Sequence, residues 1–266
     1  MPDAFDALRI GRNAMTPPDD FAERLLGQIR EELGMTTTTS QLRELYYTTI
    51  TVPDLERGQR FFNALFGWKF NPTHTDRDRH YSNVETTVAM GMNDDPDTVN
   101  LWFVADDLDD AIAKVLEMGG TVEEVDGENG DYVIATDDQG ARFGLGKQTH
   151  GPVAPVGSIP VGNPGYVTIQ VPDEARGRRF YGEVLGWRFD GGLANPGFTT
   201  VPMGLGQGEP GHVLFIKVDD PEAKAAEVRA LGGTTGDVNR WPSGIGIECT
   251  DDQGTRFWLH RPAPGY

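Results

Sequence analysis

The sequence is poor in cysteine, in basic residues and in long apolar runs. Its single cysteine, Cys249, excludes an intramolecular disulfide and a cysteine-based zinc cluster. Its 23 basic residues are outnumbered by 41 acidic ones, and a formal charge of −18 argues against binding nucleic acid or anionic membranes. No stretch approaches about 18 consecutive apolar residues, and the N-terminus lacks a basic start followed by an apolar run. We therefore expect a folded cytoplasmic protein that binds neither nucleic acid nor membrane.

The chain does contain an internal repeat, together with 34 glycines and 18 prolines that indicate many turns. Thr49–Phe70 and Thr168–Phe189 are identical at 12 of 22 positions without a gap. A second pair, TDDQGARFGL at Thr136–Leu145 and TDDQGTRFWL at Thr250–Leu259, agrees at 8 of 10 positions. Such self-similarity predicts two copies of one structural unit.

The repeat divides the chain into four segments. We expect an N-terminal helical extension and Thr-rich joint at 1–40, a first domain at 41–147, a Pro/Gly linker at 148–164 and a second domain at 165–266. The helix is predicted by an apolar stripe of Phe21, Leu25, Ile29 and Leu33. Residues 19–34 either pack on a domain or dock onto a protein partner, and Met35 is an alternative start.

Within each copy, a strand–helix–strand–strand–strand pattern occurs twice. The copies are 119 residues apart at Thr49 and Thr168 but 113 apart at Gly119 and Gly232, so the first copy has six extra residues between Phe70 and Leu101. These residues lie in a charged stretch that we expect to form a longer loop.

The residues VPDLERGQRFFNALFGWKF, VADDLDDAIAKVLEMGG and TDDQGARFGL, which recur in the same order in the second copy, resemble the vicinal oxygen chelate superfamily. This superfamily includes glyoxalase I, bleomycin-resistance proteins and extradiol dioxygenases. The resemblance covers Leu42–Arg261 and implies an α+β fold of two tandem domains, each a pair of βαβββ units that forms an eight-stranded, open barrel-like sheet around a cleft. The two-domain arrangement is similar to that of glyoxalase-like proteins of actinobacteria.

Enzymes of this superfamily hold a divalent metal with His, Gln or Glu at four places in the cleft. Carried over by position, these places are Tyr47, a residue near Met90, Asn100 and Gly144 in the first copy, and Tyr166, a residue near Met203, Val213 and Trp258 in the second. None of the positions fixed in this way is His, Glu or Asp, and a phenol with a pKa of about 10 is a poor ligand at pH 7. We therefore expect no metal and no other cofactor.

The histidines and the cysteine do not provide another metal-binding or catalytic site. His212 comes one residue too early in its strand, which turns its side chain to the opposite face. His74 and His80 lie in the charged stretch, and Cys249 lies in an apolar segment typical of a buried thiol. We assign no catalytic residue.

Strand alternation predicts an aromatic cleft lining with a few polar and cationic groups, suited to a planar or amphipathic small molecule. The expected ligand-binding residues are Tyr47, Thr49, Thr51, Asn100, Trp102 and Arg142 in the first copy and Tyr166, Thr168, Gln170, Phe215, Lys217, Arg256, Trp258 and His260 in the second. Alternatively, these side chains fill the barrels, with the two arginines paired to acids of the TDDQG turns. An open cleft is expected in the first copy, where Gly144 leaves room.

Three functions follow. The first is metal-independent binding of a small organic molecule, for sequestration or resistance. The second is a metal-dependent lyase of the lactoylglutathione lyase type, an isomerase or a dioxygenase. The third is a protein-interaction module that uses the N-terminal helix.

Overall fold

The computed structural model describes residues 43–76, 79–86, 89–124, 132–147, 159–190, 193–194 and 201–264. The expected helix at 19–34 and the linker residues 148–158 lie outside these ranges. Below, module one denotes the described residues up to 147, and module two denotes those from 159 onward. No described helix is long and apolar enough to cross a lipid bilayer.

Each module contains two helices and eight strands among its described residues. The elements of module one are β1 (Leu45–Thr51), α2 (Leu55–Phe66), β2 (His74–Asp76), β3 (Arg79–Val84), β4 (Met90–Asn93), β5 (Leu101–Val104), α3 (Leu108–Glu117), β6 (Thr121–Glu124), β7 (Tyr132–Thr136) and β8 (Arg142–Gly146). Those of module two are β9 (Pro164–Val171), α4 (Glu174–Leu185), β10 (Phe189–Asp190), β11 (Leu193–Ala194), β12 (Met203–Gln207), β13 (Gly211–Lys217), α5 (Pro221–Ala230), β14 (Thr234–Trp241), β15 (Gly244–Thr250) and β16 (Arg256–Pro262).

The strands of each module form one eight-stranded sheet, and the two sheets have the same topology. Their orders are β2-β3-β4-β1-β5-β8-β7-β6 and β10-β11-β12-β9-β13-β16-β15-β14. In both, the first strand runs parallel to the fourth and antiparallel to the fifth. The predicted α+β fold of paired βαβββ units is confirmed, and both sheets are open because their edge strands do not pair with each other.

The charged stretch of module one is not the long loop that we expected. His74–Asp76 pairs with Arg79–Val84 in an antiparallel hairpin, which places His74 and His80 on strands. The corresponding strands of module two, β10 and β11, have only two residues each. The stretch is rich in charge because it forms the edge of a sheet, where exposed polar side chains discourage further strand pairing.

The repeated VPD and GW motifs mark the two ends of a helix. Asp54 caps α2 by accepting a hydrogen bond from the Arg57 backbone N–H, and Asp173 caps α4 by accepting one from Arg176. Gly67 ends α2 with a φ of 71°, a left-handed conformation that favours glycine. The strongest sequence repeat is therefore a helix with its start and stop signals.

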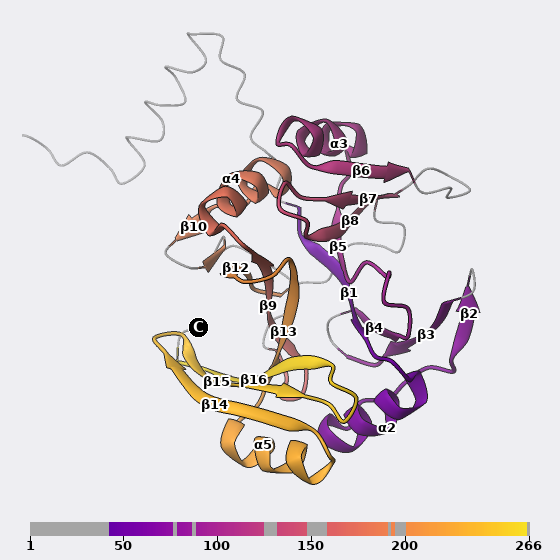
Figure 1. The fold of residues 1–266 in the computed structure, drawn as a ribbon, viewed down its shortest axis with the longest axis vertical. Helices are drawn as coiled ribbons and strands as arrows, with labels where there is room; N and C mark the ends of the chain where they lie inside the picture. The colour runs from indigo at the N-terminus through magenta and orange to yellow at the C-terminus, as the bar shows by residue number, and fades with distance from the viewer. Residues whose placement is uncertain are drawn as a thin grey trace, which may run out of the picture. The chain divides into compact units, whose positions relative to one another are not determined.

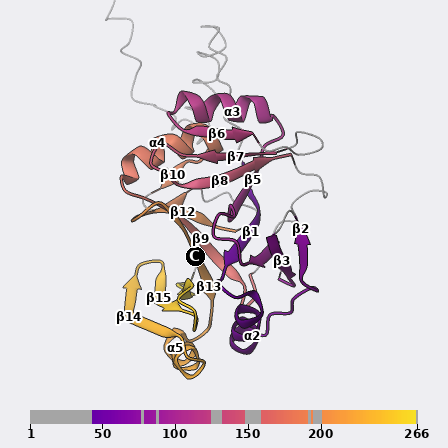
Figure 2. The ribbon, with the colours of Figure 1, turned by 45° about the vertical axis from the view of Figure 1, so that its right-hand side comes forward.

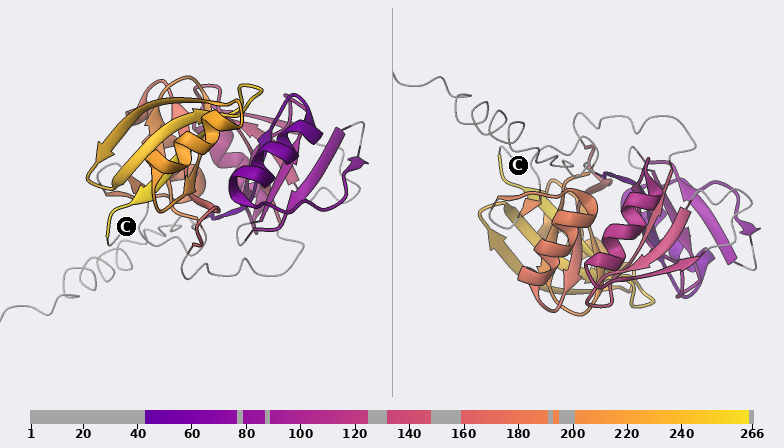
Figure 3. Two further views of the ribbon diagram at one scale, coloured as in Figure 1. Left: turned by 90° about the horizontal axis from the view of Figure 1, so that it is seen from below. Right: turned by 90° about the horizontal axis from the view of Figure 1, so that it is seen from above.

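The hydrophobic core lies between the helices and the sheets and is shared by the two modules. On α2, Phe61 and Phe62 contact Phe257 of β16 in module two, with ring centroids 6.4 and 5.4 Å apart. On α4, Tyr181 contacts Phe143 of β8 in module one at 5.9 Å. Helices α2 and α5 lie side by side, as do α3 and α4 (Figures 1, 2 and 3). Each first helix thus packs against the other module's second half.

The TDDQG turns hold the modules together at two equivalent places. The Gln253 side chain bonds both the backbone N–H and the backbone C=O of Asp54, at 2.8 and 3.1 Å. Gln139 does the same with Asp173, at 2.7 and 3.0 Å. We call these contacts the glutamine clasps. They explain why the two turns have nearly the same sequence: each one binds the helix start of the other module.

Candidate functional site

The concave face of each sheet is the side opposite the shared core. In module one, Ile50 and Val52 are buried in the core, so Tyr47, Thr49 and Thr51 on alternate positions of β1 face the concave side. In module two, Phe257 and Leu259 are fully buried in the core, so Trp258 and the residues two positions away face the concave side.

The hydroxyl end of Tyr47 lies over the backbone of β4. A Cβ atom at Gly91 would overlap the Tyr47 hydroxyl oxygen, so only glycine leaves room for the phenol there. The hydroxyl donates a hydrogen bond to Asn83 Oδ1 at 3.0 Å. Burial, with a smaller effect of Tyr81, raises the pKa of Tyr47 to about 12, so the phenol is neutral at pH 7.

Trp102 covers Gly144 in the same way. A Cβ at Gly144 would overlap the indole ring, and the indole N–H donates to the Val99 carbonyl at 3.0 Å. The ring also meets Tyr132 of β7 edge-to-face, with centroids 5.5 Å apart. The expectation that Gly144 leaves open room in the cleft is therefore wrong, because Trp102 occupies that space.

A polar cluster lies beside these rings, at the end of β1. The Thr51 hydroxyl is 3.0 Å from Asn100 Oδ1 and 3.1 Å from Asn93 Oδ1, and the Thr49 hydroxyl also donates to Asn100 Oδ1. Asn93 is 2% exposed, and its amide nitrogen has no hydrogen-bond partner among the described residues. The cluster therefore retains one buried donor without an acceptor.

The two arginines of the predicted lining pair with acids on their own sheets. Arg142 lies 3.2 Å from Glu123 and donates to the Asp97 carbonyl at 3.0 Å, whereas Arg256 donates to Glu248. The alternative in which they pair with acids of the TDDQG turns is wrong. Those acids are bonded by Arg57 and Arg176 of the two helices instead, at 2.5 and 2.8 Å.

In module two the predicted residues form a row of rings. Phe215 stacks on Trp258 with centroids 5.4 Å apart, and it meets Tyr166 at 5.5 Å and His260 at 5.8 Å. The Lys217 ammonium group donates a 2.8 Å hydrogen bond to the Ile159 carbonyl. Thr168 and Gln170 lie further along β9 than Tyr166, opposite Gly204 and Gly206 of β12.

His212 does not join this row. It pairs with Ile169 of β9, a core residue, and therefore faces the opposite side from Tyr166. Burial lowers the pKa of His212 to about 4, and a contact with the Thr49 backbone only partly offsets this effect. His212 is thus a neutral residue between the modules at pH 7.

The donor set does not fit the divalent metal that the superfamily implies. Tyr47 and Asn100 present a neutral phenol and an amide, and Gly144 presents no side chain. In module two, Val213 and Trp258 offer no ligand atom. Among the described residues, no three His, Cys, Asp or Glu side chains converge as a metal site would require.

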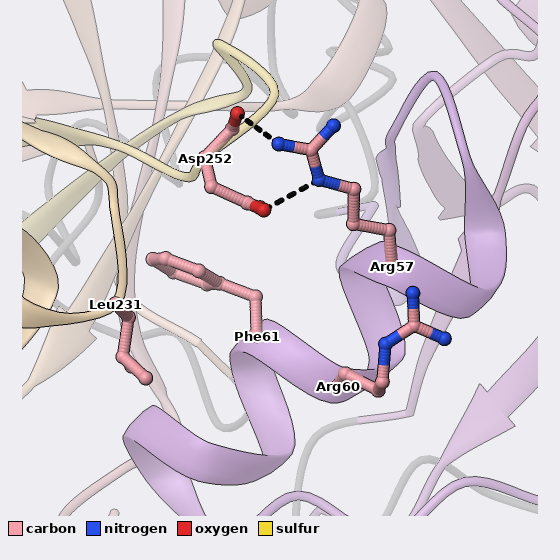
Figure 4. Close-up of a pocket in the computed structure, with 5 residues that line it drawn as sticks. All are labelled: Arg57, Arg60, Phe61, Leu231 and Asp252. Atoms are coloured by element: carbon pink, nitrogen blue, oxygen red, sulfur yellow. Dashed lines mark hydrogen bonds and ion pairs between the residues drawn. The ribbon is translucent and has the colours of Figure 1, made fainter.

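A separate pocket lies outside the concave faces, where α2 meets module two. It is lined by Arg57, Arg60, Phe61, Leu231 and Asp252 (Figure 4). The Arg57 guanidinium group faces Asp252 and bonds both its carboxylate and its backbone oxygen, at 2.5 and 3.0 Å. This pocket belongs to the module junction, because its polar groups bond each other across it.

The sequence prediction missed several residues of the concave faces. In module one, Asn83, Asn93 and Tyr132 contact predicted residues, and Tyr132 could have been found by the same strand alternation. In module two, Trp241 contacts Trp258 at 5.4 Å but ends its strand beside a turn, so its face could not be read from alternation.

Comparisons with known proteins identify a similar family and similar folds. Residues 47–146 match the family described as a glyoxalase-like domain. Among solved structures, catechol 2,3-dioxygenase is similar with a TM-score of 0.58 at 17% identity, over 85% of this chain and 91% of that one. The 2,3-dioxygenase LapB from Pseudomonas sp. KL28 is similar with a TM-score of 0.56 at 14% identity, over 86% and 96%. No curated protein matches the sequence.

At 14% and 17% sequence identity, these structures show a common fold and do not show a common reaction. The family match spans the whole concave face of module one, from Tyr47 to Gly146, and the solved structures extend the same fold through module two. Residues 47–146 thus match the glyoxalase-like domain family, and the chain as a whole shares the fold of these two solved structures.

Proposed function

We propose that module one binds a small aromatic or amphipathic organic molecule on its concave face, without a metal ion. The observation that carries this proposal is the placement of Tyr47 over Gly91 and of Trp102 over Gly144. Both rings are fixed against the sheet and are only partly buried. Fixed aromatic surfaces bind planar ligands at low entropic cost, because no side chain has to be ordered on binding.

The polar cluster supplies a second kind of contact. Leaving a buried amide donor without an acceptor costs about 1–3 kcal/mol, and the Asn93 amide nitrogen is such a donor. A ligand oxygen that reaches it would recover part of this energy. The preferred ligand is therefore a planar molecule with a hydrogen-bond acceptor at one end.

Metal independence follows from the chemistry of the side chains. A tightly held divalent transition metal would need carboxylate or imidazole ligands in a convergent set, and the concave positions of module one carry mainly hydroxyl, amide, aromatic and glycine residues. Tyr47 is further from ionisation than a free phenol, because burial raises its pKa to about 12. Sequestration of a small molecule, as in resistance proteins, needs no metal.

The second candidate is a metal-dependent lyase, isomerase or dioxygenase. Its support is the similarity of the fold to catechol 2,3-dioxygenase and to LapB. It predicts stoichiometric iron, manganese, nickel or zinc in protein purified without chelators, and a loss of thermal stability on chelation. The first proposal predicts neither result.

The test is a thermal-shift and calorimetric screen of divalent metal salts and of aromatic acids, phenols and quinones. We expect stabilisation by at least one aromatic compound and none by metals. Trp102→Ala should weaken that binding at least tenfold, whereas Val238→Ala, which removes an exposed apolar side chain of module two, should leave it unchanged. Stoichiometric metal binding, or equal binding by the Trp102→Ala variant, would contradict the proposal.

Two further expectations stay predictions. A cytoplasmic location is suggested by the single cysteine and the acidic composition. If residues 19–34 dock onto a protein partner, deletion of residues 1–40 should abolish its capture and leave the melting temperature of the remaining chain nearly unchanged.

A further inference from the structure

Module two presents an exposed tryptophan at the edge of its sheet. Trp241 ends the edge strand β14, and its side chain is 40% exposed. Its partner in the sheet is Gly244 of β15, which places it on the concave side. Single exposed apolar side chains are common on protein surfaces, so exposure alone carries no function. What distinguishes Trp241 is the arrangement of rings beside it.

Trp241 is the last member of a continuous row of rings. Its centroid lies 5.4 Å from that of Trp258, with the planes tilted by 46°. Trp258 stacks on Phe215 at 5.4 Å and 24°, and Phe215 meets Tyr166 at 5.5 Å. The row, which we call the aromatic row, crosses module two from the central strand β9 to the edge. Contact with the row holds the exposed indole in a defined orientation.

Gly246 makes room for the outer end of the row. A Cβ atom there would lie 2.6 Å from the Trp241 ring, which is too close for that ring to remain in place, and 3.1 Å from the Trp258 ring. The equivalent position of module one is Tyr132, which pairs with Gly146 as Gly246 pairs with His260. The flat indole surface is therefore particular to module two.

The charged groups that flank the row are engaged within the protein. Arg256 donates to Glu248, and Lys217 donates to the Ile159 carbonyl at 2.8 Å. Burial lowers the pKa of His260 from its ordinary value, which favours the neutral imidazole at pH 7. A charged ligand would therefore have to displace an existing pair, whereas a neutral ring would not.

We propose that Trp241 and Trp258 form a second binding site, independent of the one in module one, which stacks a neutral planar aromatic molecule. The ligand lies against the exposed face of Trp241, and the aromatic row fixes that face. Aromatic stacking of this kind adds to the burial of apolar area and depends on ring geometry. Saturated molecules of the same size gain only the burial.

The test uses 2-naphthol as the probe, with cyclohexanol and maltose as comparisons, in isothermal titration calorimetry of the full chain. We expect saturable binding of 2-naphthol. Trp241→Ala should weaken binding at this site at least fivefold, and Trp241→Phe should retain most of it. Because Trp241 is exposed, the melting temperature of both variants should stay close to that of the unmodified protein, which excludes misfolding as the cause.

The two sites can be separated by their variants. If 2-naphthol also binds module one, the unmodified protein shows two sites, Trp102→Ala removes one and Trp241→Ala removes the other. If the unmodified protein binds aromatic compounds only at the Trp241-dependent site, the proposed function is contradicted and this inference stands. Unchanged binding in Trp241→Ala, or a Trp241-dependent site that takes maltose or cyclohexanol as well as 2-naphthol, would overturn the inference.

Discussion

The two modules are alike where they meet and different where they face away from each other. At the junction, the glutamine clasps of Gln139 and Gln253 have nearly the same lengths. On the concave faces, Asn93 and Asn100 of module one correspond to Gly206 and Val213 of module two, so the polar cluster exists in only one of them. The identical motifs therefore form the interface between the modules, and the copies differ on the concave faces, where we propose ligand binding.

The rings of the concave faces show the same contrast in another form. In module one the ring beside the fifth strand comes from Tyr132 on the seventh strand, and the eighth strand carries Gly144. In module two the eighth strand supplies Trp258, and the seventh carries Gly246. Each module thus combines one aromatic residue and one glycine at these two places, in opposite order, and another ring, Trp102 or Trp241, lies over the glycine.

The largest loss of stability is expected when both positions of module one carry an aromatic residue. Gly144→Trp places a second ring where Trp102 already lies, and overpacking of this size costs about 3 kcal/mol of unfolding free energy. Adding Tyr132→Gly recreates the order of module two and removes the ring that Trp102 contacts, so Trp102 can move aside and at least half of the loss should be recovered. Urea denaturation followed by circular dichroism measures both changes. A single variant as stable as the unmodified protein, or a double variant no more stable than the single one, would refute the idea that each module accepts an aromatic residue at only one of the two positions.

A second contrast lies inside the shared core. The Tyr181 hydroxyl of α4 donates to Asp137 Oδ2 at 2.9 Å, and both residues are buried. The equivalent helix position in α2 is Phe62, and the equivalent acid, Asp251, has a buried Oδ2 with no partner among the described residues. Burial raises the pKa of Asp251 above its ordinary value. The hydrogen bond from Tyr181 to Asp137 therefore has no counterpart at Asp251.

Exchanging these helix residues should change stability in opposite directions. Tyr181→Phe removes the donor to a buried carboxylate and should cost about 1–3 kcal/mol, whereas Phe62→Tyr offers Asp251 a donor and should stabilise by about 1 kcal/mol. Both are measured as free energies of unfolding in urea. A destabilised Phe62→Tyr variant would show that the α2 core has no room for the hydroxyl.

The Phe62→Tyr effect should depend on pH. Because the pKa of Asp251 is raised in the folded state, its contribution to stability is present below the unfolded pKa of about 3.9 and is lost as pH rises through the folded pKa. A hydroxyl donor favours the charged carboxylate, so the gain from Phe62→Tyr should be larger at pH 7 than at pH 3.5. An equal gain at both values would mean that the hydroxyl does not bond Asp251.

The two glutamine clasps should contribute equally to the free energy of unfolding. Gln139→Ala and Gln253→Ala each remove two hydrogen bonds to a helix start, and because these bonds are exposed to water we expect a loss of about 1 kcal/mol in each case. Gln59→Ala, on the outer face of α2, is the control and should change stability by less than half as much. A clear difference between the two clasps would contradict their equivalence.

Much of the fold could be predicted because the repeated motifs encode local structure. Asp54 and Gly67 begin and end their helix, and a second copy with the same signals confirms the pattern. The order of the rings could not be predicted in the same way. Whether Trp102 or an open space lies over Gly144 depends on side-chain packing across three strands, which alternation along one strand does not determine.

The partners of the arginines could not be predicted for a related reason. Arg142 and Arg256 lie next to the TDDQG acids in sequence, yet their side chains reach acids on neighbouring strands. The turn acids are bonded by Arg57 and Arg176, which are far away in sequence and belong to the other module. The shared core brings them together, and that association leaves no local signal.

The smallest effect is expected from these strand arginines. The Arg142–Glu123 pair has side chains 37% and 58% exposed, and the Arg256–Glu248 pair 57% and 37%. Exposed pairs contribute about 0–1 kcal/mol, so Arg142→Met and Arg256→Met should each cost less than about 0.5 kcal/mol, and the cost should fall further in 1 M NaCl. Arg142 also bonds the Asp97 carbonyl, so its variant should be the less stable of the two. A larger or salt-independent loss at Arg256 would show that it supports the aromatic row by packing rather than by charge.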